Sequence, residues 1–279
     1  PPPLLTQERK NLLWRILHYT VLISLLVVFV GPFLWMASVS VRGAEDVYKL
    51  TLIPDDITWE NYQYVLENSS LGRALINSVL VALIIVGTNV LLASLAAYPL
   101  ARLNFPGSRV IFLLILSTLM IPFQLNLIPL FALTAKLHLL DTFTGVILPA
   151  SVNAFGIYLI RQHYLTIPKD LDEAARIDGA SEFGIWWRIM LPLTKPAVAA
   201  LGIFIFVMAW SDFLWPLIVL NSPEKYTLPI AIAKLSGTFI DRTAYVAAGS
   251  VIAVLPIIIL FFFAQKFFIG GLTLGGVKE

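Results

Sequence analysis

The sequence predicts an all-α, polytopic membrane protein with six transmembrane helices and both termini in the cytoplasm. Of its 279 residues, 58% are hydrophobic and only 13% are charged, whereas a soluble domain carries about 25% charged residues. Apolar runs of about 20 residues recur along the chain, and a helix of that length crosses the ~30 Å hydrocarbon core of a bilayer. These two observations exclude an ordinary soluble domain.

Each expected span is a long apolar run between polar segments. The first run is too long and too poorly flanked for a cleaved signal peptide, so it is expected to be a true span. Pro122, Pro129 and Pro149 interrupt the third and fourth runs. Kinks are expected there, because neighbouring helices can satisfy the carbonyl groups that a proline frees. The expected spans are residues 17–39, 74–98, 110–133, 143–160, 196–220 and 247–268.

Lys and Arg indicate the orientation, since cytoplasmic loops of membrane proteins carry an excess of both. One side of the expected topology holds twelve of the 19 Lys and Arg residues and the other side holds seven. The richer side is therefore expected to be cytoplasmic. The resulting division is a cytoplasmic N-terminus at 1–16, a transmembrane domain at 17–268 and a cytoplasmic tail at 269–279, with outer loops at 42–73 and 221–246 and a cytoplasmic loop at 161–195.

The cytoplasmic loop carries the signals of two short helices. Pro168 prevents the preceding helix from continuing, and Asp170 and Glu173 have the spacing of a capping box. Gly179 fits a left-handed stop at the end of the first helix. We therefore expect one helix near residues 171–178.

A second helix is expected to start near Ser181 and to end before Pro192. It contains Trp186 and Trp187, which can anchor it at the membrane surface or in a groove of a partner. The loop is thus expected to be a helical pair, and the alternative is an interfacial re-entrant helix that only links two spans.

The same loop contains a motif that is rarely matched by chance. Residues 173–192 read EAARIDGASEFGIWWRIMLP, which is Glu-Ala-Ala, three residues, Gly, nine residues and Ile-x-Leu-Pro. At average residue usage, such a match arises by accident on the order of once in 10⁵ chains. The segment resembles the cytoplasmic EAA loop in the membrane subunits of binding-protein-dependent ATP-binding-cassette importers.

Other stretches are similar to the carbohydrate-uptake branch of that family, the branch of the maltose permease. Residues 210–216 (WSDFLWP) are close to the family's Trp-Asn-Asp-Phe pattern, with Ser211 where Asn is commoner. Further similar stretches are Ala97-Tyr98 with Arg102, Thr227-Leu228-Pro229 and Gly271-Leu272-Thr273.

The resemblance implies a type I ABC importer permease fold and a transmembrane pathway subunit of an ATP-driven carbohydrate importer. The solute would be a disaccharide, an oligosaccharide, a glycosyl-glycerol or a similar compound. The implied partners are a second homologous permease subunit in a heterodimer, two ATP-binding-cassette ATPase subunits and an extracytoplasmic solute-binding protein. ATP and Mg²⁺ would bind the ATPase partner, and the location would be a bacterial or archaeal cytoplasmic membrane.

In that family the loop helices form the coupling helix, which inserts in a cleft of the nucleotide-binding subunit and passes its motion to the spans. The residues implied to couple the ATPase are Asp172, Glu173, Ala174, Ala175, Ile177, Asp178, Gly179, Ala180, Leu191 and Pro192.

Polar residues inside the spans are candidates for the substrate pathway. In the second span Asn77 and Thr88, and likewise Ser78 and Asn89, are eleven residues apart and so share one helix face. That face should avoid lipid, either to hydrogen-bond neighbouring helices or to contact substrate. Gln124, Asn126 and Asn153 lie near proline-broken segments and could line a cavity.

Asp212 is the sole carboxylate within an expected span, ~24 Å from its inner edge. An acid at this depth is a functional hypothesis by default. It could line the outer vestibule or hold a structural hydrogen bond at a helix end. Trp210 and Trp215 nearby could stack on sugar rings or belong to the interfacial aromatic belt.

Several functions are disfavoured. The chain has no Cys, its three His residues lack metal-ligand spacing, and neither a phosphate-binding loop nor a nucleophile–base pair is found. An enzyme is not expected. The net charge of +2 does not suggest a nucleic-acid partner. An alternative of another class is an ion-coupled secondary transporter of small polar solutes, but such proteins need ionisable groups near the midplane.

Overall fold

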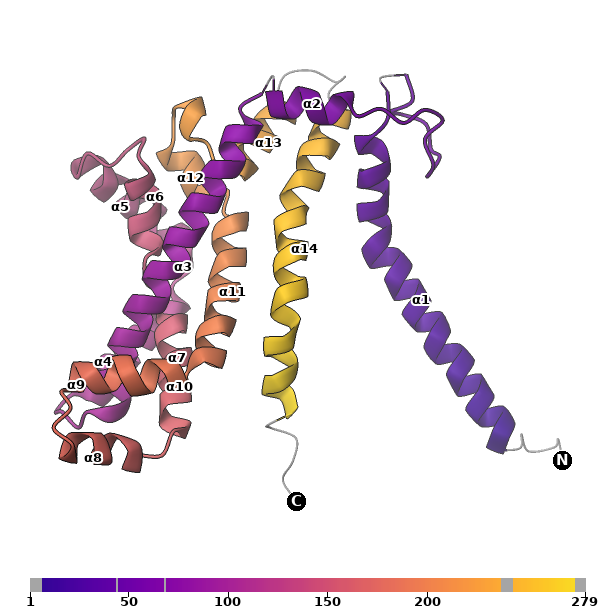
Figure 1. Ribbon diagram of the computed structural model, residues 1–279. Helices are drawn as coiled ribbons and strands as arrows, with labels where there is room; N and C mark the ends of the chain where they lie inside the picture. The colour runs from indigo at the N-terminus through magenta and orange to yellow at the C-terminus, as the bar shows by residue number, and fades with distance from the viewer. Residues whose placement is uncertain (1–6, 44, 68, 237–242, 274–279) are drawn as a thin grey trace. The chain divides into compact units, whose positions relative to one another are not determined.

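The computed structural model describes residues 7–43, 45–67, 69–236 and 243–273, with side chains placed between residues 11 and 265. The described residues form helices and connecting turns, with one isolated β-bridge between Arg42 and Ile57 (Figure 1). The predicted all-α class is confirmed. Two compact units make up the chain: residues 1–69 with 232–252, and residues 70–231 with 253–279.

The first unit contains α1 (Gln7–Ser40), α2 (Glu60–Glu67) and the start of α14 (Thr243–Thr273). A buried guanidinium organises the loop after α1. Arg42 donates hydrogen bonds to the Ser38 hydroxyl (3.0 Å) and to the carbonyl oxygens of Asp46 (3.1 Å) and Lys49 (2.6 Å). The start of the predicted outer loop at 42–73 is therefore organised around one side chain.

The second unit is built around α3 (Leu71–Arg102), which packs against α7 (Ala154–Thr166) and α11 (Lys195–Ser211). A glycine permits the close approach of these helices. A Cβ atom at Gly156 would lie 3.2 Å from the Ala93 Cβ and 3.3 Å from the Leu201 side chain. Small residues thus bring three helices together around one apolar core.

Among the described residues, three helices are each long and apolar enough to cross a membrane, and three bent helix pairs raise the number of candidate spans to as many as six. The single helices are Asn11–Ser40, Leu71–Arg102 and Thr243–Gln265. The bent pairs are Ser108–Met120 with Phe123–Lys136 (101°), Phe143–Ala150 with Ala154–Thr166 (42°), and Glu182–Leu193 with Lys195–Ser211 (78°).

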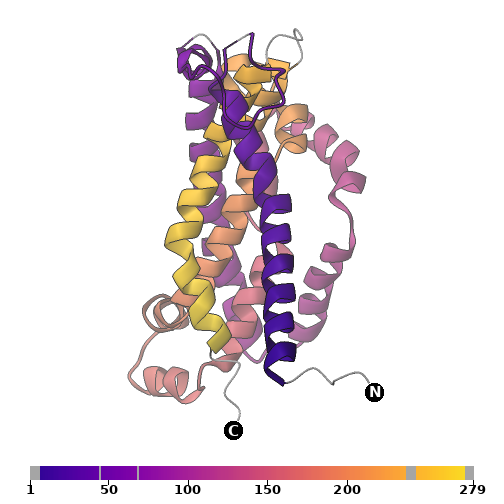
Figure 2. The same ribbon diagram turned by 90° about the vertical axis from the view of Figure 1, so that its right-hand side faces the viewer.

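The prolines act largely as the sequence predicts. Pro122 marks the break between α4 (Ser108–Ser117) with η1 (Thr118–Met120) and α5 (Phe123–Lys136), which is visible in Figure 2. Pro149 lies in the last turn of α6 (Phe143–Ala150), directly before the bend to α7. Pro129 does not end a helix, because α5 continues through that residue.

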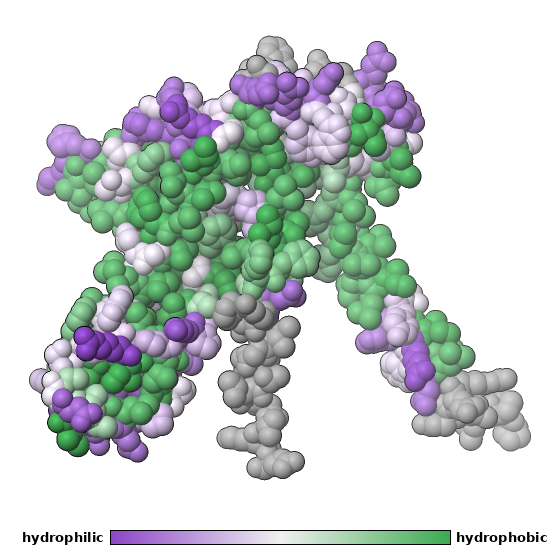
Figure 3. All heavy atoms as spheres, viewed as in Figure 1, coloured by the Kyte–Doolittle hydropathy of each residue, from purple (hydrophilic) through white to green (hydrophobic). Residues whose placement is uncertain are grey.

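The expected span at 196–220 is not one helix. Helix α11 ends at Ser211, and α12 (Leu214–Val219) begins after Asp212 and Phe213. The backbone of Asp212 is extended, with φ −69° and ψ 120°, so the helical hydrogen-bond series stops there. Figure 3 shows apolar side chains over the middle of the second unit and hydrophilic ones at its two ends.

Candidate functional site

The first helix of the segment between α7 and α11, α8 (Asp170–Ile177), ends in a tight left-handed stop. Gly179 has φ +80°. Its amide donates to the Arg176 carbonyl (3.0 Å), and the Ala180 amide donates to the Ala175 carbonyl (2.9 Å). These two bonds form a Schellman motif. The predicted role of Gly179 is confirmed.

The predicted capping box is wrong. Lys169, not Asp170, is the residue that precedes α8, and no side chain caps the helix. The amides of Asp172 and Glu173 instead donate to the Lys169 carbonyl, at 2.9 and 3.1 Å. Asp170 already lies in the first turn, where its side chain cannot reach these amides in capping geometry.

The second helix begins as predicted, with the Ser181 hydroxyl accepting from the Gly184 amide (3.2 Å). It does not end before Pro192. Helix α9 (Glu182–Ile185) continues through a π-helical turn, η2 (Trp186–Met190), into α10 (Leu191–Leu193). A proline is tolerated at the start of a helical segment, where its missing N–H costs nothing.

The two tryptophans of the second helix have different environments. Trp186 is buried in the core of the second unit, whereas Trp187 is 53% exposed. Only Trp187 is therefore placed to reach a membrane surface or a partner.

Side chains at the end of α3 hold this helical pair. The Arg102 Nε lies 3.1 Å from the Asp172 Oδ2, and the two side chains are only 1% and 3% exposed. A second guanidinium nitrogen of Arg102 donates to the Ile167 carbonyl (2.7 Å). Burial raises the pKa of the Asp172 carboxyl, and the neighbouring Arg102 charge opposes that rise.

A second contact joins α3 to α9. The Tyr98 hydroxyl donates to the Glu182 carboxylate (2.6 Å), which also accepts from Arg176 at 2.7 Å and 3.2 Å. The contacts that Tyr98, Arg102 and Glu182 make were not predicted from the sequence. A usable signal was present, because Tyr98 and Arg102 are four residues apart and share a face at the end of an apolar run.

The outer face of the helical pair combines apolar and acidic groups. Ile177 of the first helix is 86% exposed, and Phe183 and Trp187 of the second helix are also exposed. Among the predicted coupling residues, Asp172 and Ala175 are buried and Leu191 is half-buried. The others are exposed: Glu173, Ala174, Ile177, Asp178, Gly179, Ala180 and Pro192. We call this exposed set, with Phe183 and Trp187, the loop face.

A cavity of about 420 Å³ lies within the second unit. It brings together four of the residues predicted for the substrate pathway: Asn89, Asn153, Asp212 and Trp215. Ile85, Phe123, Ala150, Ile205 and Met208 contribute to its mostly apolar wall.

The polar side chains of the cavity lining provide hydrogen-bond acceptors and donors, since Asn153 and Ser211 line it beside Asn89 and Asp212. Asn89 is fully buried and donates to the Ala150 carbonyl, while its Oδ1 has no hydrogen-bond partner among the described residues. The Asp212 Oδ1 is 3.5 Å from the Trp215 amide, and the Trp215 indole N–H donates to the Gly145 carbonyl (3.1 Å). Asp212 thus both lines the cavity and sits at a helix end. Free acceptors of this kind suit a ligand that donates hydroxyl hydrogens.

The other predicted pathway residues lie outside the cavity lining. Gln124 and Asn126 are on an exposed face of α5. Trp210 is buried against Phe206, with ring centroids 5.6 Å apart, and its indole N–H donates to the Ala253 carbonyl (3.0 Å).

Asn77 has a helix-joining role at the other end of α3. Its side-chain amide donates to the carbonyl oxygens of Glu224 (2.9 Å) and Tyr226 (3.0 Å). The hydroxyl of the next residue, Ser78, accepts from the Leu228 amide (2.7 Å). These bonds fasten α3 to the segment after α12.

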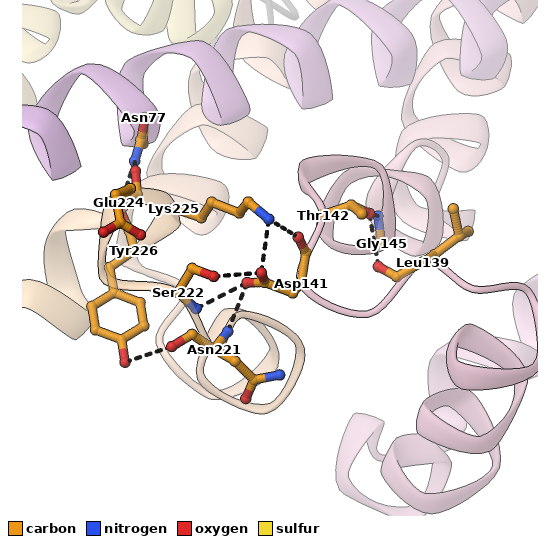
Figure 4. A network of polar contacts seen from close by, with 10 residues as sticks. All are labelled: Asn77, Leu139, Asp141, Thr142, Gly145, Asn221, Ser222, Glu224, Lys225 and Tyr226. Carbon is orange, nitrogen blue, oxygen red and sulfur yellow. Dashed lines mark hydrogen bonds and ion pairs between the residues drawn. The ribbon is translucent and has the colours of Figure 1, made fainter.

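Asp141 organises the same region (Figure 4). Its carboxylate accepts from the Asn221 and Ser222 amides (both 3.0 Å), from the Ser222 hydroxyl (2.6 Å) and from Lys225 (2.7 Å). The hydrogen bond from Lys225 is the main reason that the pKa of Asp141 is held well below its usual range. Asn77, Asp141 and Lys225 form a junction that we call the outer junction.

Long apolar helices and proline-broken helix pairs are the features of a multi-pass membrane protein. The family model described as "Binding-protein-dependent transport system inner membrane component" matches residues 89–272. The chain belongs to this family, as its sequence motifs predict.

Relatives of the chain are permease proteins. It is 42% identical to the arabinooligosaccharides transport system permease protein AraQ of Halalkalibacterium halodurans, over 92% of this chain and 93% of that protein. It is 34% identical to the trehalose transport system permease protein SugB of Mycobacterium tuberculosis, over 95% and 98%.

The structure is also similar to a solved chain. A bacterial ABC transporter involved in the import of the acidic polysaccharide alginate contains a chain that matches with a TM-score of 0.84 and 26% identity. The match covers 95% of this chain and 99% of that one.

Proposed function

We propose that this chain is the transmembrane pathway subunit of an ATP-driven, solute-binding-protein-dependent carbohydrate importer. The observation that carries the proposal is the loop face, a solvent-exposed surface on a helical pair that is fixed to the end of a spanning helix. Such a surface suits a soluble partner that moves the spans when it closes over ATP. The family description, which names binding-protein dependence, supports a solute-binding protein as a further partner.

The loop face has the chemistry of a docking surface for an ATPase subunit. Ile177, Phe183 and Trp187 offer apolar and aromatic contact area, and Glu173 offers an exposed carboxylate. Aromatic side chains are common anchors of protein interfaces. One carboxylate among them provides a specific charge contact for a basic residue of the partner.

The loop face is assigned to the cytoplasm, together with both termini. The excess of Lys and Arg on that side of the chain supports this orientation. The complete transporter would contain a second, homologous permease subunit and two ATPase subunits in a bacterial or archaeal cytoplasmic membrane. ATP and Mg²⁺ would bind the ATPases.

Two independent features support a carbohydrate as the solute. The permeases of the arabinooligosaccharide and trehalose systems are related to this chain over nearly its whole length. The cavity also combines an apolar wall with acceptor oxygens of Asn89 and Asp212, which suits the hydroxyl groups and the apolar ring faces of a sugar. Asn89, Asn153, Asp212 and Trp215 are the residues assigned to the pathway within this cavity.

The proposal is tested by purification of the tagged chain with its partners from its native membrane. A second permease and an ATPase are expected to co-purify. Glu173→Ala should reduce the recovered ATPase, because it removes one of the two exposed carboxylates of the loop face, whereas Asp170→Ala on the same helix should not. A chain that is recovered alone and transports solute without any ATPase would contradict the proposal and favour an ion-coupled secondary transporter.

A further inference from the structure

The cytoplasmic helical pair is connected to the spans in three ways, and these differ in stiffness. Towards α7 the chain passes through the non-helical residues Ile167 and Pro168. Towards α11 it passes through the 78° bend next to Thr194. Non-helical residues of this kind can absorb a rotation by changes in φ and ψ.

The third connection, to α3, is made by side-chain contacts and is the stiffest of the three. The Arg102–Asp172 pair is almost completely buried, so water cannot replace either partner without cost. Arg102 is also held by the Ile167 carbonyl at 2.7 Å. The Tyr98–Glu182 bond of 2.6 Å adds a second point of attachment, on the second helix of the pair. Two attachment points prevent the pair from pivoting about a single contact.

Helix α3 leads directly from these contacts to the cavity. Ile85 and Asn89 line the cavity, and Tyr98 and Arg102 lie on the same uninterrupted helix. The thirteen residues from Asn89 to Arg102 correspond to ~20 Å of helix. Pro99 removes one hydrogen bond within this stretch, but the helix continues through it, so one element still joins the two sites.

We propose that Arg102 and Tyr98 are positioning residues that couple the loop face to the cavity, with α3 as the element that carries the movement. The inference rests on the proposed function, because it requires an ATPase that moves the loop face. Bends next to Thr194 and at residues 167–168 allow α7 and α11 to follow, while α3 moves with the helical pair as one body.

The absence of native cysteine makes a direct test possible. An Ile85→Cys reporter on the cavity wall is placed in the full transporter in proteoliposomes, and its rate of reaction with a small thiol reagent is measured with and without ATP. The same preparations give the solute transported per ATP hydrolysed. If α3 moves with the loop face, ATP changes the labelling rate of the reporter.

Two variants break the contacts without changing the loop face. Asp172→Asn removes the carboxylate that pairs with Arg102, and Tyr98→Phe removes only the hydroxyl that bonds Glu182. Both should retain the ATPase, and the ATP-dependent change in labelling should fall by roughly 2- to 30-fold, the range typical of residues that carry coupling between sites. Transport per ATP should fall with it. Asp170→Asn is the matched control, since this exposed acid of α8 does not contact α3.

The outcomes separate the two proposals. If the transporter that carries only the Ile85→Cys reporter binds no ATPase, the proposed function as an importer subunit is overturned. An intact assembly in which Tyr98→Phe keeps the full labelling response and full transport per ATP overturns the role of α3. Tyr98→Phe decides this point even if Asp172→Asn fails to assemble, because the phenyl ring retains its edge-to-face contact with Tyr164 (6.3 Å).

Discussion

At the scale of single residues, Gly179 determines how the helical pair between α7 and α11 turns. Its φ of +80° is a conformation that side chains with a Cβ rarely adopt. Among the described residues other than its two chain neighbours, none has an atom within 4 Å of a Cβ built at this position, so glycine is needed for the backbone conformation and not for space. The local sequence was therefore sufficient to identify this residue.

Gly179→Val should loosen the helical pair. A left-handed backbone costs a residue with a Cβ about 1–2 kcal/mol, and a β-branched residue is a marked outlier there. The expected result is weaker retention of the ATPase and a lower temperature of thermal inactivation. Gly87→Ala, within α3 and also in open space, is the control. Equal retention in the two variants would show that the turn does not need its left-handed residue.

Asp141 should make the outer junction sensitive to acid. Its pKa is lowered in the folded protein, chiefly by Lys225. Its stabilisation is therefore fully present above the unfolded-state pKa of about 3.9 and is lost as the pH falls through the lower folded-state value. The apparent unfolding temperature of the purified protein should thus vary little near neutral pH and fall in strong acid.

Asp141→Asn removes the ion pair at every pH. The variant should unfold at a lower temperature near pH 7, and it should lose the part of the acid dependence due to this carboxyl. Thermal scans of both proteins between about pH 3 and about pH 7 measure the effect. Parallel curves for the two proteins would mean that another group dominates the acid response.

At the scale of elements, breaks in helices were partly predictable. Pro122 and Pro149 lie at or beside bends, as their missing N–H groups suggest. Pro129 lies within an unbroken α5, so a proline alone does not mark the end of a helix. The stop after Ser211 was missed, because an apolar run on both sides of Asp212 hides a helix end from any hydropathy pattern.

The cavity between the elements gives a specific prediction for Asp212. Asp212→Asn should reduce solute uptake by about tenfold or more, because a hydrogen bond to a charged group contributes about 1.5–3 kcal/mol. The ATPase should still co-purify, since the loop face is unchanged. The same Asp-to-Asn change at exposed Asp170 should leave uptake unaltered. Unchanged uptake in Asp212→Asn would assign this residue to the helix end alone.

At the scale of the whole molecule, the proposed orientation can be measured directly. In the cysteine-free chain, Asp178→Cys on the loop face and Glu224→Cys beside the outer junction are exposed single sites. A thiol reagent that cannot cross the membrane should label position 224 from outside intact cells. Position 178 should react only after the membrane is opened. The opposite pattern would reverse the topology that Lys and Arg predict.

The sequence by itself determined the membrane class, the approximate helices, the family and the turn at Gly179. These features depend on local properties: the length of an apolar run, the charges next to it, the φ angle that a residue tolerates, and a motif that is continuous in the chain. None of them requires knowledge of which helices are neighbours.

Only the tertiary structure decided which polar groups meet. Arg102 and Asp172 are separated by 70 positions, Tyr98 and Glu182 by 84, and Asn77 and Tyr226 by 149. Helices that are apolar on every side carry no periodic signal for the direction in which a given side chain points. Packing around residues such as Gly156 sets the rotation of each helix, and that rotation brings Asn89 and Asp212 to one cavity.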